Sequence, residues 1–249
     1  MKERSFALQS GRGYLIRGSA RFQKKTEERT VVLLCHGLGV SRRYPLLRSI
    51  AHDLEKRGHS WVTFDFAGHG QSGGRVKDRR VLNFIRDIRT VMQWIRKQSQ
   101  APSFLVGHSI GALAGLAFAS EYRSRLSGVV LIGCNAYAGH KYRLMLREGK
   151  TRSYARYSVV GSARVSTTFW KERLAHEPHR MIASLHVPVL IVCGSADRTN
   201  PVAESRILFR VAHQPKQLAI VKGADHYFRK ARQQTAAAQA ISNWLLAYV

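Results

Sequence analysis

The chain has 249 residues, 45% of them hydrophobic, and 41 lysines and arginines against 15 aspartates and glutamates give it a formal net charge of +26. This length and composition predict a folded domain with a well-buried core and exclude an intrinsically disordered chain. The basic residues are spread along the whole chain, so the sequence lacks the single basic tail that is typical of a nucleic-acid-binding arm.

The sequence gives no sign of membrane insertion or secretion. No stretch reaches the roughly 18 consecutive apolar residues of a transmembrane helix, and the first residues lack the apolar core of a secretory signal. Cys35, Cys134 and Cys193 fit neither a zinc-binding spacing nor a complete disulfide framework, and each ends an apolar run. We therefore expect a cytoplasmic protein with buried, reduced thiols.

Predicted strands alternate with predicted helices along most of the chain. Two short runs flank the turn-forming residues 10–13 and predict an antiparallel β-hairpin. Continuous apolar runs then predict strands over residues 30–35, 60–66, 103–107, 126–133, 187–194 and 216–223. Helical patterns lie between or after them, over residues 45–58, 81–97, 203–212 and 235–249. This alternation indicates a mostly parallel α/β sheet that helices cover on both faces.

Residues 138–184 interrupt the alternation, because they contain helix-like stretches and no run that resembles a strand. One of these stretches follows Thr167 and Thr168, either of which can cap a helix. The segment falls between two predicted strands, where it would lie over the carboxyl ends of the sheet. We therefore expect residues 1–137 and 185–249 to form one core and residues 138–184 to form a small helical lid.

A sharp turn is predicted where the strand over residues 103–107 ends. The turn has the sequence Gly107-His108-Ser109-Ile110-Gly111, and a helical run of small and apolar residues follows it. Ser109 could simply cap that helix at an ordinary corner. The two glycines instead favour a strained turn that projects the serine side chain, with the positive end of the helix directed at it. The pattern therefore indicates a nucleophilic serine.

A serine hydroxyl needs a base to become a nucleophile, and the base needs an orienting partner. Most of the eleven histidines occupy helical or surface-like stretches, whereas His36 and His226 each follow a predicted strand. Asp197 follows the strand over residues 187–194 and is a suitable carboxylate. The residues alone leave both His36 and His226 as candidates for the base.

The order Ser109, Asp197, His226 is that of the α/β-hydrolases, and the chain resembles this family from near its first strand to its last helix. Residues 36–39, 65–72, 107–111, 194–197 and 223–228 resemble, in that order, the family's oxyanion loop, its D-x-x-G-x-G-x-S segment, its nucleophile elbow, its acid turn and its histidine loop. The resemblance implies an α/β-hydrolase fold. It also implies acyl transfer to water through a covalent seryl intermediate, with no metal or cofactor.

The resemblance assigns roles to individual residues. Ser109 is the expected nucleophile, His226 its base, and Asp197 the residue that orients the base. The backbone N–H groups of Leu38 and Ile110 are expected to bind the oxyanion. The residues expected to support that loop are His36, Gly37 and Gly39. Asp65 and His69 are expected to fix the loop around Gly68 and Gly70. Asp225 adjoins His226 in sequence, but a neighbour in sequence usually points elsewhere, so Asp197 is preferred as the orienting acid.

The motifs most resemble those of small esterases, namely feruloyl or cinnamoyl esterases, monoacylglycerol-lipase-like enzymes and serine aminopeptidase-like hydrolases. The resemblance therefore implies hydrolysis of esters with a short- to medium-chain or aromatic acyl group. Reaction at a thioester, peptide or C–C bond, or acyl transfer to another alcohol, is the alternative. Aromatic residues that either line a substrate pocket or pack the lid are Tyr137, Tyr142, Tyr154, Tyr157, Phe169, Trp170 and Tyr227.

The positive charge leads to a further hypothesis about partners. Residues 140–180 hold ten lysines and arginines against three glutamates, which could attract acidic esters or lead to weak association with anionic surfaces. A non-catalytic polyanion-binding protein is a third functional hypothesis, which rests on the net charge alone. No motif typical of specific nucleic-acid binding is present, and the sequence does not indicate an oligomeric state.

Overall fold

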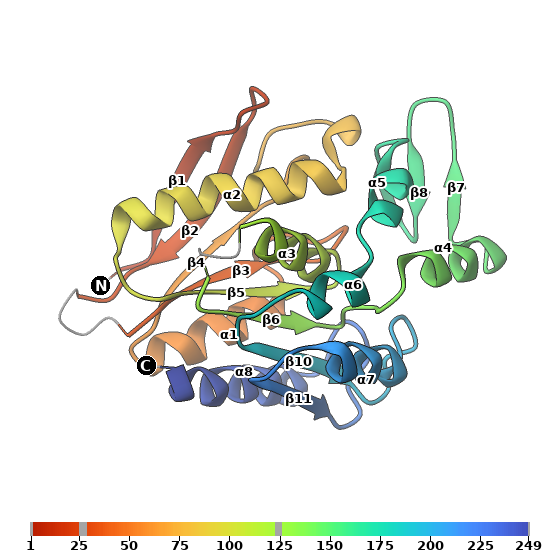
Figure 1. Cartoon of the computed structure of the whole chain (residues 1–249). Helices are drawn as coiled ribbons and strands as arrows, with labels where there is room; N and C mark the ends of the chain where they lie inside the picture. The colour runs from red at the N-terminus through yellow and green to blue at the C-terminus, as the bar shows by residue number, and fades with distance from the viewer. Residues whose placement is uncertain (1, 25–28, 123–125, 249) are drawn as a thin grey trace.

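The computed structural model describes residues 2–24, 29–122 and 126–248. The strands of its main sheet are β1 Arg4–Gln9, β2 Leu15–Arg21, β3 Val31–Cys35, β4 Ser60–Phe64, β5 Ser103–His108, β6 Gly128–Ile132, β10 Val189–Gly194 and β11 Lys216–Val221. Their order across the sheet is β1-β2-β4-β3-β5-β6-β10-β11 (Figure 1). β2 pairs antiparallel with β1 and β4, and the other neighbouring pairs are parallel. The predicted hairpin and mostly parallel sheet are therefore confirmed.

Four strands of this sheet, β3, β4, β6 and β10, are buried at every residue, whereas β1, β2 and β11 are partly exposed. In β3, Val31, Leu33 and Cys35 belong to one hydrophobic cluster, and Val32 and Leu34 belong to the other. All five side chains are fully buried. Because a strand alternates its side chains between two faces, such a run is stable only when helices cover both.

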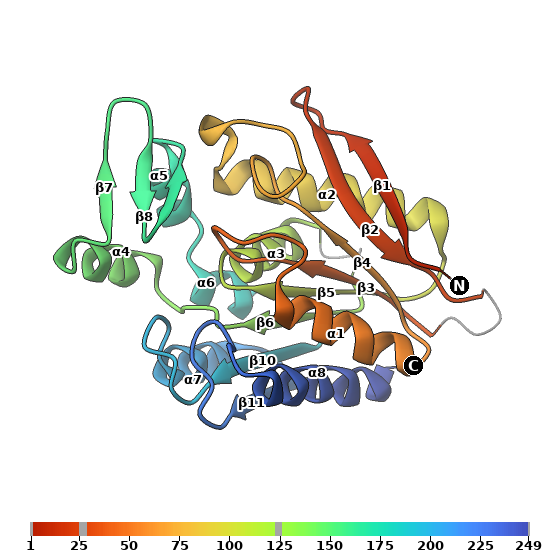
Figure 2. The same ribbon diagram turned by 180° about the vertical axis from the view of Figure 1, so that it is seen from behind.

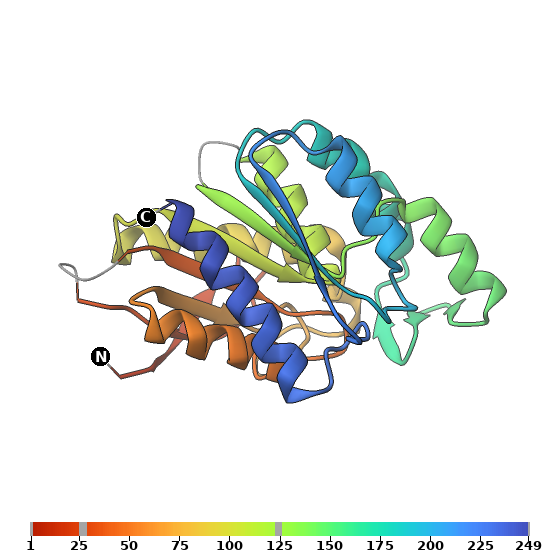
Figure 3. The same ribbon diagram turned by 90° about the horizontal axis from the view of Figure 1, so that it is seen from below.

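Helices supply this cover. α1 and α8 lie side by side on one face, and α2 and α3 pack on the opposite face (Figures 2 and 3). The bounds are α1 Pro45–Lys56, α2 Val81–Gln98, α3 Ile110–Glu121, α7 Val202–Val211 and α8 Ala231–Leu245, with 3₁₀ turns η1 Val76–Asp78 and η3 Leu246–Tyr248. α8 begins four residues before the predicted start, because its first turn is polar and partly exposed and so carries no apolar periodicity.

The segment between β6 and β10 differs from the prediction. It contains α4 Ala138–Arg147, β7 Thr151–Ser153, β8 Ser158–Val160, β9 Ala163–Val165, α5 Phe169–Ala175 and α6 Pro178–Ala183. β7, β8 and β9 form a separate antiparallel sheet, so the expectation of an all-helical segment is wrong. Each of these strands has three residues, too few to give a recognisable alternation, and Gly161 at a φ of 60° turns β8 into β9. We call residues 138–184 the insertion.

Most of the insertion, from α4 to α5, lies beyond the end of the sheet toward which β6 points, and α6 packs against α3 and α7 (Figure 1). Thr168 directly precedes α5, but its hydroxyl contacts the side chains of Ser166 and Glu172 and makes no cap bond to the helix. Thr168 therefore occupies the predicted N-cap position without the side-chain bond that a capping threonine forms. Cys35, Cys134 and Cys193 are buried free thiols. Within the described residues, no helix is both long and apolar enough to cross a membrane.

Candidate active site

Ser109 occupies a strained turn between β5 and α3. Its φ is 55° and its ψ is −114°, a conformation that is costly for a residue with a side chain. A Cβ on Gly107 would lie 2.4 Å from the carbonyl oxygen of Gly111, and a Cβ on Gly111 would lie 2.6 Å from those of Cys35 and His36. The two glycines therefore allow α3 to begin directly against β3 and β5, and Ser109 sits where the chain turns.

Ser109, His226 and Asp197 form one hydrogen-bonded chain. His226 Nε2 lies 3.0 Å from Ser109 Oγ, and His226 Nδ1 lies 2.8 Å from Asp197 Oδ2. An ionised carboxylate can only accept, so Nδ1 carries the ring proton and Nε2 is free to accept from the serine hydroxyl. His226 and Asp197 are each only 5% exposed, so bulk water has little access to the hydrogen bond between them.

The second oxygen of Asp197 is also occupied. Oδ1 accepts the backbone N–H groups of Thr199 at 2.8 Å and Asn200 at 2.7 Å, which fix the orientation of the carboxylate. Asp225, the sequence neighbour of His226, instead forms an exposed ion pair with Arg229. The structure therefore brings Asp197, and not Asp225, to His226.

The loop over residues 36–39 lies beside this chain. A Cβ on Gly37 would lie 3.6 Å from the Ser109 Cβ. His36 is fully buried; its Nε2 accepts the N–H of Phe66 at 3.0 Å and its Nδ1 donates to the carbonyl of Gly37 at 2.7 Å. Burial lowers the pKa of His36 to about 4, so the neutral ring keeps both bonds. His36 thus fixes the loop and is not the partner of Ser109.

The two predicted oxyanion donors lie at the same place as Ser109. Leu38 and Ile110 both line the cavity onto which Ser109 opens. Ile110 is the first residue of α3, and N–H groups in a first helical turn have no acceptor within the helix. The positive end of the helix dipole adds to the potential there. Gly39, at a φ of 76°, turns the loop directly after Leu38.

Asp65 and His69, which follow β4, have structural surroundings. Asp65 forms a buried ion pair with Arg42 and also accepts the backbone N–H groups of Arg42 and Gln71. His69 donates to the carbonyl of Ala67 at 3.0 Å. These contacts hold the loop after β4 in one conformation.

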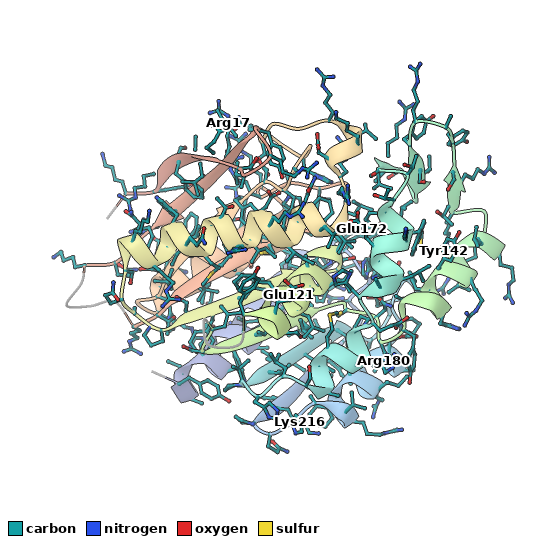
Figure 4. The ribbon with its side chains drawn as sticks, turned by 45° about the horizontal axis from the view of Figure 1, so that its top comes forward. Arg17, Glu121, Tyr142, Glu172, Arg180 and Lys216 are labelled. Atoms are coloured by element: carbon teal, nitrogen blue, oxygen red, sulfur yellow. The ribbon has the colours of Figure 1, made fainter. Side chains whose placement is uncertain are left out.

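A cavity of about 140 Å³ opens onto Ser109 and His226 between the sheet and the insertion. Phe169, Trp170 and Tyr227 line it, whereas the other four predicted aromatic residues are not in its lining. Tyr137 packs on the ring of His179, and Tyr154 and Tyr157 pack on each other. Tyr142, which Figure 4 labels on α4, packs on the ring of Trp170. These four side chains therefore stabilise the insertion.

Comparison with known proteins agrees with this geometry. A family model described as serine aminopeptidase, S33, matches residues 26–159, more than half of the chain. The chain belongs to this family. It is thus an α/β-hydrolase. The family and the relatives described next support a hydrolase of the esterase and lipase kind.

The S33 chain has relatives with assigned activities. It is 27% identical over 257 residues to the monoacylglycerol lipase of Mycolicibacterium smegmatis, covering 90% of each protein. It is 27% identical to human monoglyceride lipase, covering 84% of this chain and 80% of that one. An esterase domain from Rhodothermus marinus has a TM-score of 0.80 at 20% identity, with 98% of each chain covered. Est1E from Butyrivibrio proteoclasticus with bound ferulic acid has a TM-score of 0.81 at 15% identity, with 97% of this chain and 98% of that one covered. These two structures show a common fold.

His108, in the turn that carries Ser109, has a structural role that the sequence analysis missed. Its buried Nε2 donates to the backbone carbonyl of His226 at 2.9 Å, and its ring stacks on Tyr44. Burial lowers the pKa of His108 to about 3, so the ring stays neutral. His108 therefore ties the serine turn to the loop that carries His226.

The sequence analysis also missed several residues of the cavity wall. These are Val40, Asn135, Lys141, Met145, Val160, Gly161, Ser162, Ala163, Arg173, Thr199 and Asn200. Val40, Asn135, Thr199 and Asn200 follow strands, as the predicted site residues do, and this position is a signal that could have found them. In the described part of the chain, no group of three or more histidine, cysteine, aspartate or glutamate residues is placed to hold a metal ion.

Proposed function

We propose that this S33-family chain hydrolyses carboxylic esters with short- to medium-chain or aromatic acyl groups through a seryl acyl-enzyme. The observation that carries the proposal is the Ser109–His226–Asp197 hydrogen-bonded chain at the edge of a cavity that both apolar and polar residues line. The relatives that act on monoacylglycerols support an ester as the substrate.

The first half of the reaction forms the acyl-enzyme. His226 Nε2 removes the proton of Ser109 Oγ as that oxygen attacks the ester carbonyl, and the imidazolium then returns the proton to the departing alcohol oxygen. Asp197 stabilises the imidazolium and keeps Nδ1 protonated. The ionised form of Asp197 is in turn held by the N–H groups of Thr199 and Asn200.

The oxyanion that develops on the carbonyl needs donors that are already in place. The N–H groups of Leu38 and Ile110 serve this role, with the N-terminus of α3 adding positive potential. Loss of one such donor typically raises the barrier by about 3–4 kcal/mol. In the second half of the reaction, a water molecule replaces the alcohol, and His226 activates it in the same way.

The test is hydrolysis of 4-nitrophenyl esters from acetate to palmitate, together with methyl ferulate, by the wild type, Ser109→Ala and Ser120→Ala. Ser120 lies on the same helix as the serine turn, and its hydroxyl bonds back to the carbonyls of Leu116 and Met181. We expect turnover to vanish in Ser109→Ala and to persist in Ser120→Ala. A fluorophosphonate should label the wild type once, at Ser109. A folded wild type that turns over no ester contradicts the proposal.

Amide hydrolysis is the second candidate, because the matched family is described as a serine aminopeptidase family. An aminopeptidase must hold the positive α-ammonium group of its substrate. The described residues that line the cavity include Lys141 and Arg173 and no aspartate or glutamate, so this wall repels an ammonium group. Faster turnover of leucine 4-nitroanilide than of every ester would reverse this order.

A further inference from the structure

The cavity onto which Ser109 opens contains buried positive charge. Arg173, on α5, lines it with only 7% of its surface exposed, and the partly buried Lys141, on α4, lines it too. Burial lowers the pKa of both groups, and the guanidinium of Arg173 lowers that of Lys141 further. Among the described residues of the wall there is no carboxylate to compensate.

Two hydrogen-bond donors in this wall have no acceptor. Arg173 Nη2 donates to Asn135 Oδ1, which fixes the orientation of the Asn135 amide. Arg173 Nη1 and Asn135 Nδ2 are both buried and make no hydrogen bond to any described residue. Buried polar groups are paired in the great majority of cases. Two neighbouring residues of the cavity wall that each keep an unpaired donor therefore point to a ligand that brings acceptor oxygens.

The carboxylates nearest to Arg173 are engaged elsewhere. Glu172 pairs with Arg80 and accepts the N–H of Leu82. Glu177 accepts the N–H groups of residues 138 and 139, and Glu204 accepts those of residues 136 and 137. Glu177 and Glu204 are close enough to stabilise the charge of Arg173, but in the described part of the chain no carboxylate forms an ion pair with it.

Two acceptors in the wall also lack partners, but they belong to the serine end of the cavity. His108 Nδ1 and Asn200 Oδ1 are buried without a hydrogen bond to a described residue. His108 is bonded to the carbonyl of His226, and the N–H of Asn200 is bonded to Asp197. The unpaired donors thus cluster around the guanidinium, and the unpaired acceptors adjoin the hydrogen-bonded chain.

We propose that Arg173, together with Asn135 and Lys141, binds an anionic oxygen group of the substrate, so that the preferred esters carry a carboxylate or a phosphate in addition to the scissile bond. This inference rests on the proposed ester hydrolysis and names its substrate class. The unpaired Nη1 of Arg173 and Nδ2 of Asn135 can each donate one hydrogen bond to the oxygens of either anion. A neutral hydroxyl or carbonyl would satisfy a donor but would leave the guanidinium without a direct ion-pair partner.

Two matched pairs of esters distinguish charge from shape and one anion from the other. The first pair is the 4-nitrophenyl half-ester of adipic acid and its neutral isostere, the 4-nitrophenyl ester of adipic acid monoamide. The second pair is 1-butyrylglycerol 3-phosphate and 1-butyrylglycerol. The quantity measured is the ratio of kcat/KM for the anionic ester to that for its neutral partner, in the wild type, Arg173→Met, Lys141→Met and Lys171→Met. Lys171 is the matched control, because it is exposed on the same helix and outside the cavity wall.

We expect the wild type to prefer the anionic member of at least one pair by about tenfold or more, the size of a charge-assisted hydrogen bond. The pair in which this occurs identifies the anion. Arg173→Met should abolish the preference, Lys141→Met should reduce it, and Lys171→Met should leave it unchanged. If Arg173→Met fails to fold, Lys141→Met decides, and an undiminished preference in that variant overturns the inference.

A wild type that hydrolyses the neutral esters without preferring an anion in either pair overturns the inference and leaves the proposed function intact. A folded wild type that hydrolyses none of the four esters, nor any ester of the 4-nitrophenyl series, contradicts the proposed function itself. A preference that falls equally in Lys171→Met and Arg173→Met assigns the effect to the general surface charge and overturns the part given to Arg173.

Discussion

Replacing Asp197 by asparagine should nearly abolish hydrolysis while leaving the fold intact. Oδ1 of Asp197 accepts two backbone N–H groups, from Thr199 and Asn200. In Asp197→Asn the amide oxygen must keep that position, because an amide NH₂ there would face two donors. The amide nitrogen then replaces Oδ2, 2.8 Å from His226 Nδ1, and directs a donor at it.

This donor reverses the tautomer of His226. Nδ1 becomes the acceptor, the ring proton moves to Nε2, and Nε2 then points a proton at Ser109 Oγ, 3.0 Å away. The histidine can no longer accept the serine proton in its dominant form. A tautomer error of this kind lowers kcat by about 10⁴-fold in an enzyme with a Ser-His-Asp triad, and about 10⁴-fold corresponds to roughly 5.5 kcal/mol in the barrier.

The assay is steady-state hydrolysis of 4-nitrophenyl butyrate at neutral pH, with thermal unfolding measured for each variant. Asp225→Asn is the matched control, since Asp225 adjoins His226 in sequence but pairs with Arg229 at the surface. We expect a loss of about 10³- to 10⁴-fold in Asp197→Asn and less than a twofold change in Asp225→Asn. The reasoning is refuted if Asp197→Asn keeps a tenth or more of the activity, or if Asp225→Asn loses as much.

Two further predictions concern the glycine of the serine turn and a buried carboxyl. Gly111→Ala places a Cβ against two backbone carbonyls. Overpacking of this kind should lower the unfolding free energy by about 1–3 kcal/mol and reduce kcat. A variant that unfolds at the same Tm as the wild type would contradict this prediction. Burial raises the pKa of Asp87 to about 7. Between about pH 4 and pH 7 the Asp87 carboxyl is therefore protonated in the folded state and ionised in the unfolded state. Its contribution to the free energy of unfolding falls as the pH rises through this range. Urea titrations from pH 5 to 8 should therefore show the stability of the wild type falling relative to that of Asp87→Asn, and parallel curves would refute this.

The sheet and the serine turn were predictable because local sequence determines them. β3, β6 and β10 are buried throughout, and β5 is buried from Phe104 onward, so their short continuous apolar runs identify them as central strands. Gly107 and Gly111 occupy positions where a Cβ would meet backbone atoms, and no other residue fits there. The places of Asp197 and His226 after their strands follow from the parallel topology, because the carboxyl ends of parallel strands meet at one edge of the sheet.

The insertion was not predictable in the same way. Its three-residue strands are specified by turns and by local contacts, such as the bond from Trp170 Nε1 to Thr151 Oγ1 at 2.7 Å, and not by an apolar period. Tyr142 and Trp170 are both aromatic residues of the insertion and cannot be told apart by residue type, yet only Trp170 lines the cavity. The sequence did not indicate that Arg173 is buried in the cavity wall. An arginine is almost never fully buried without a partner, and a sequence does not show which arginine is the exception.

The distinction between Arg173 and the other basic residues leads to a prediction about salt. Exposed charges are screened beyond about 8 Å at physiological ionic strength, whereas buried charges are screened much less. If the surface lysines and arginines supplied the attraction for anionic esters, the preference for them would fall steeply as sodium chloride rises from 50 to 500 mM. If Arg173 recognises the anion, added salt should remove only the long-range part of the attraction. The ratio of kcat/KM for the anionic ester to that for the neutral ester should then stay close to its low-salt value at 500 mM. The measurement is the same pair of initial rates across the salt series. A ratio that decays to one at 500 mM would locate recognition on the outer surface of the insertion and not in the cavity.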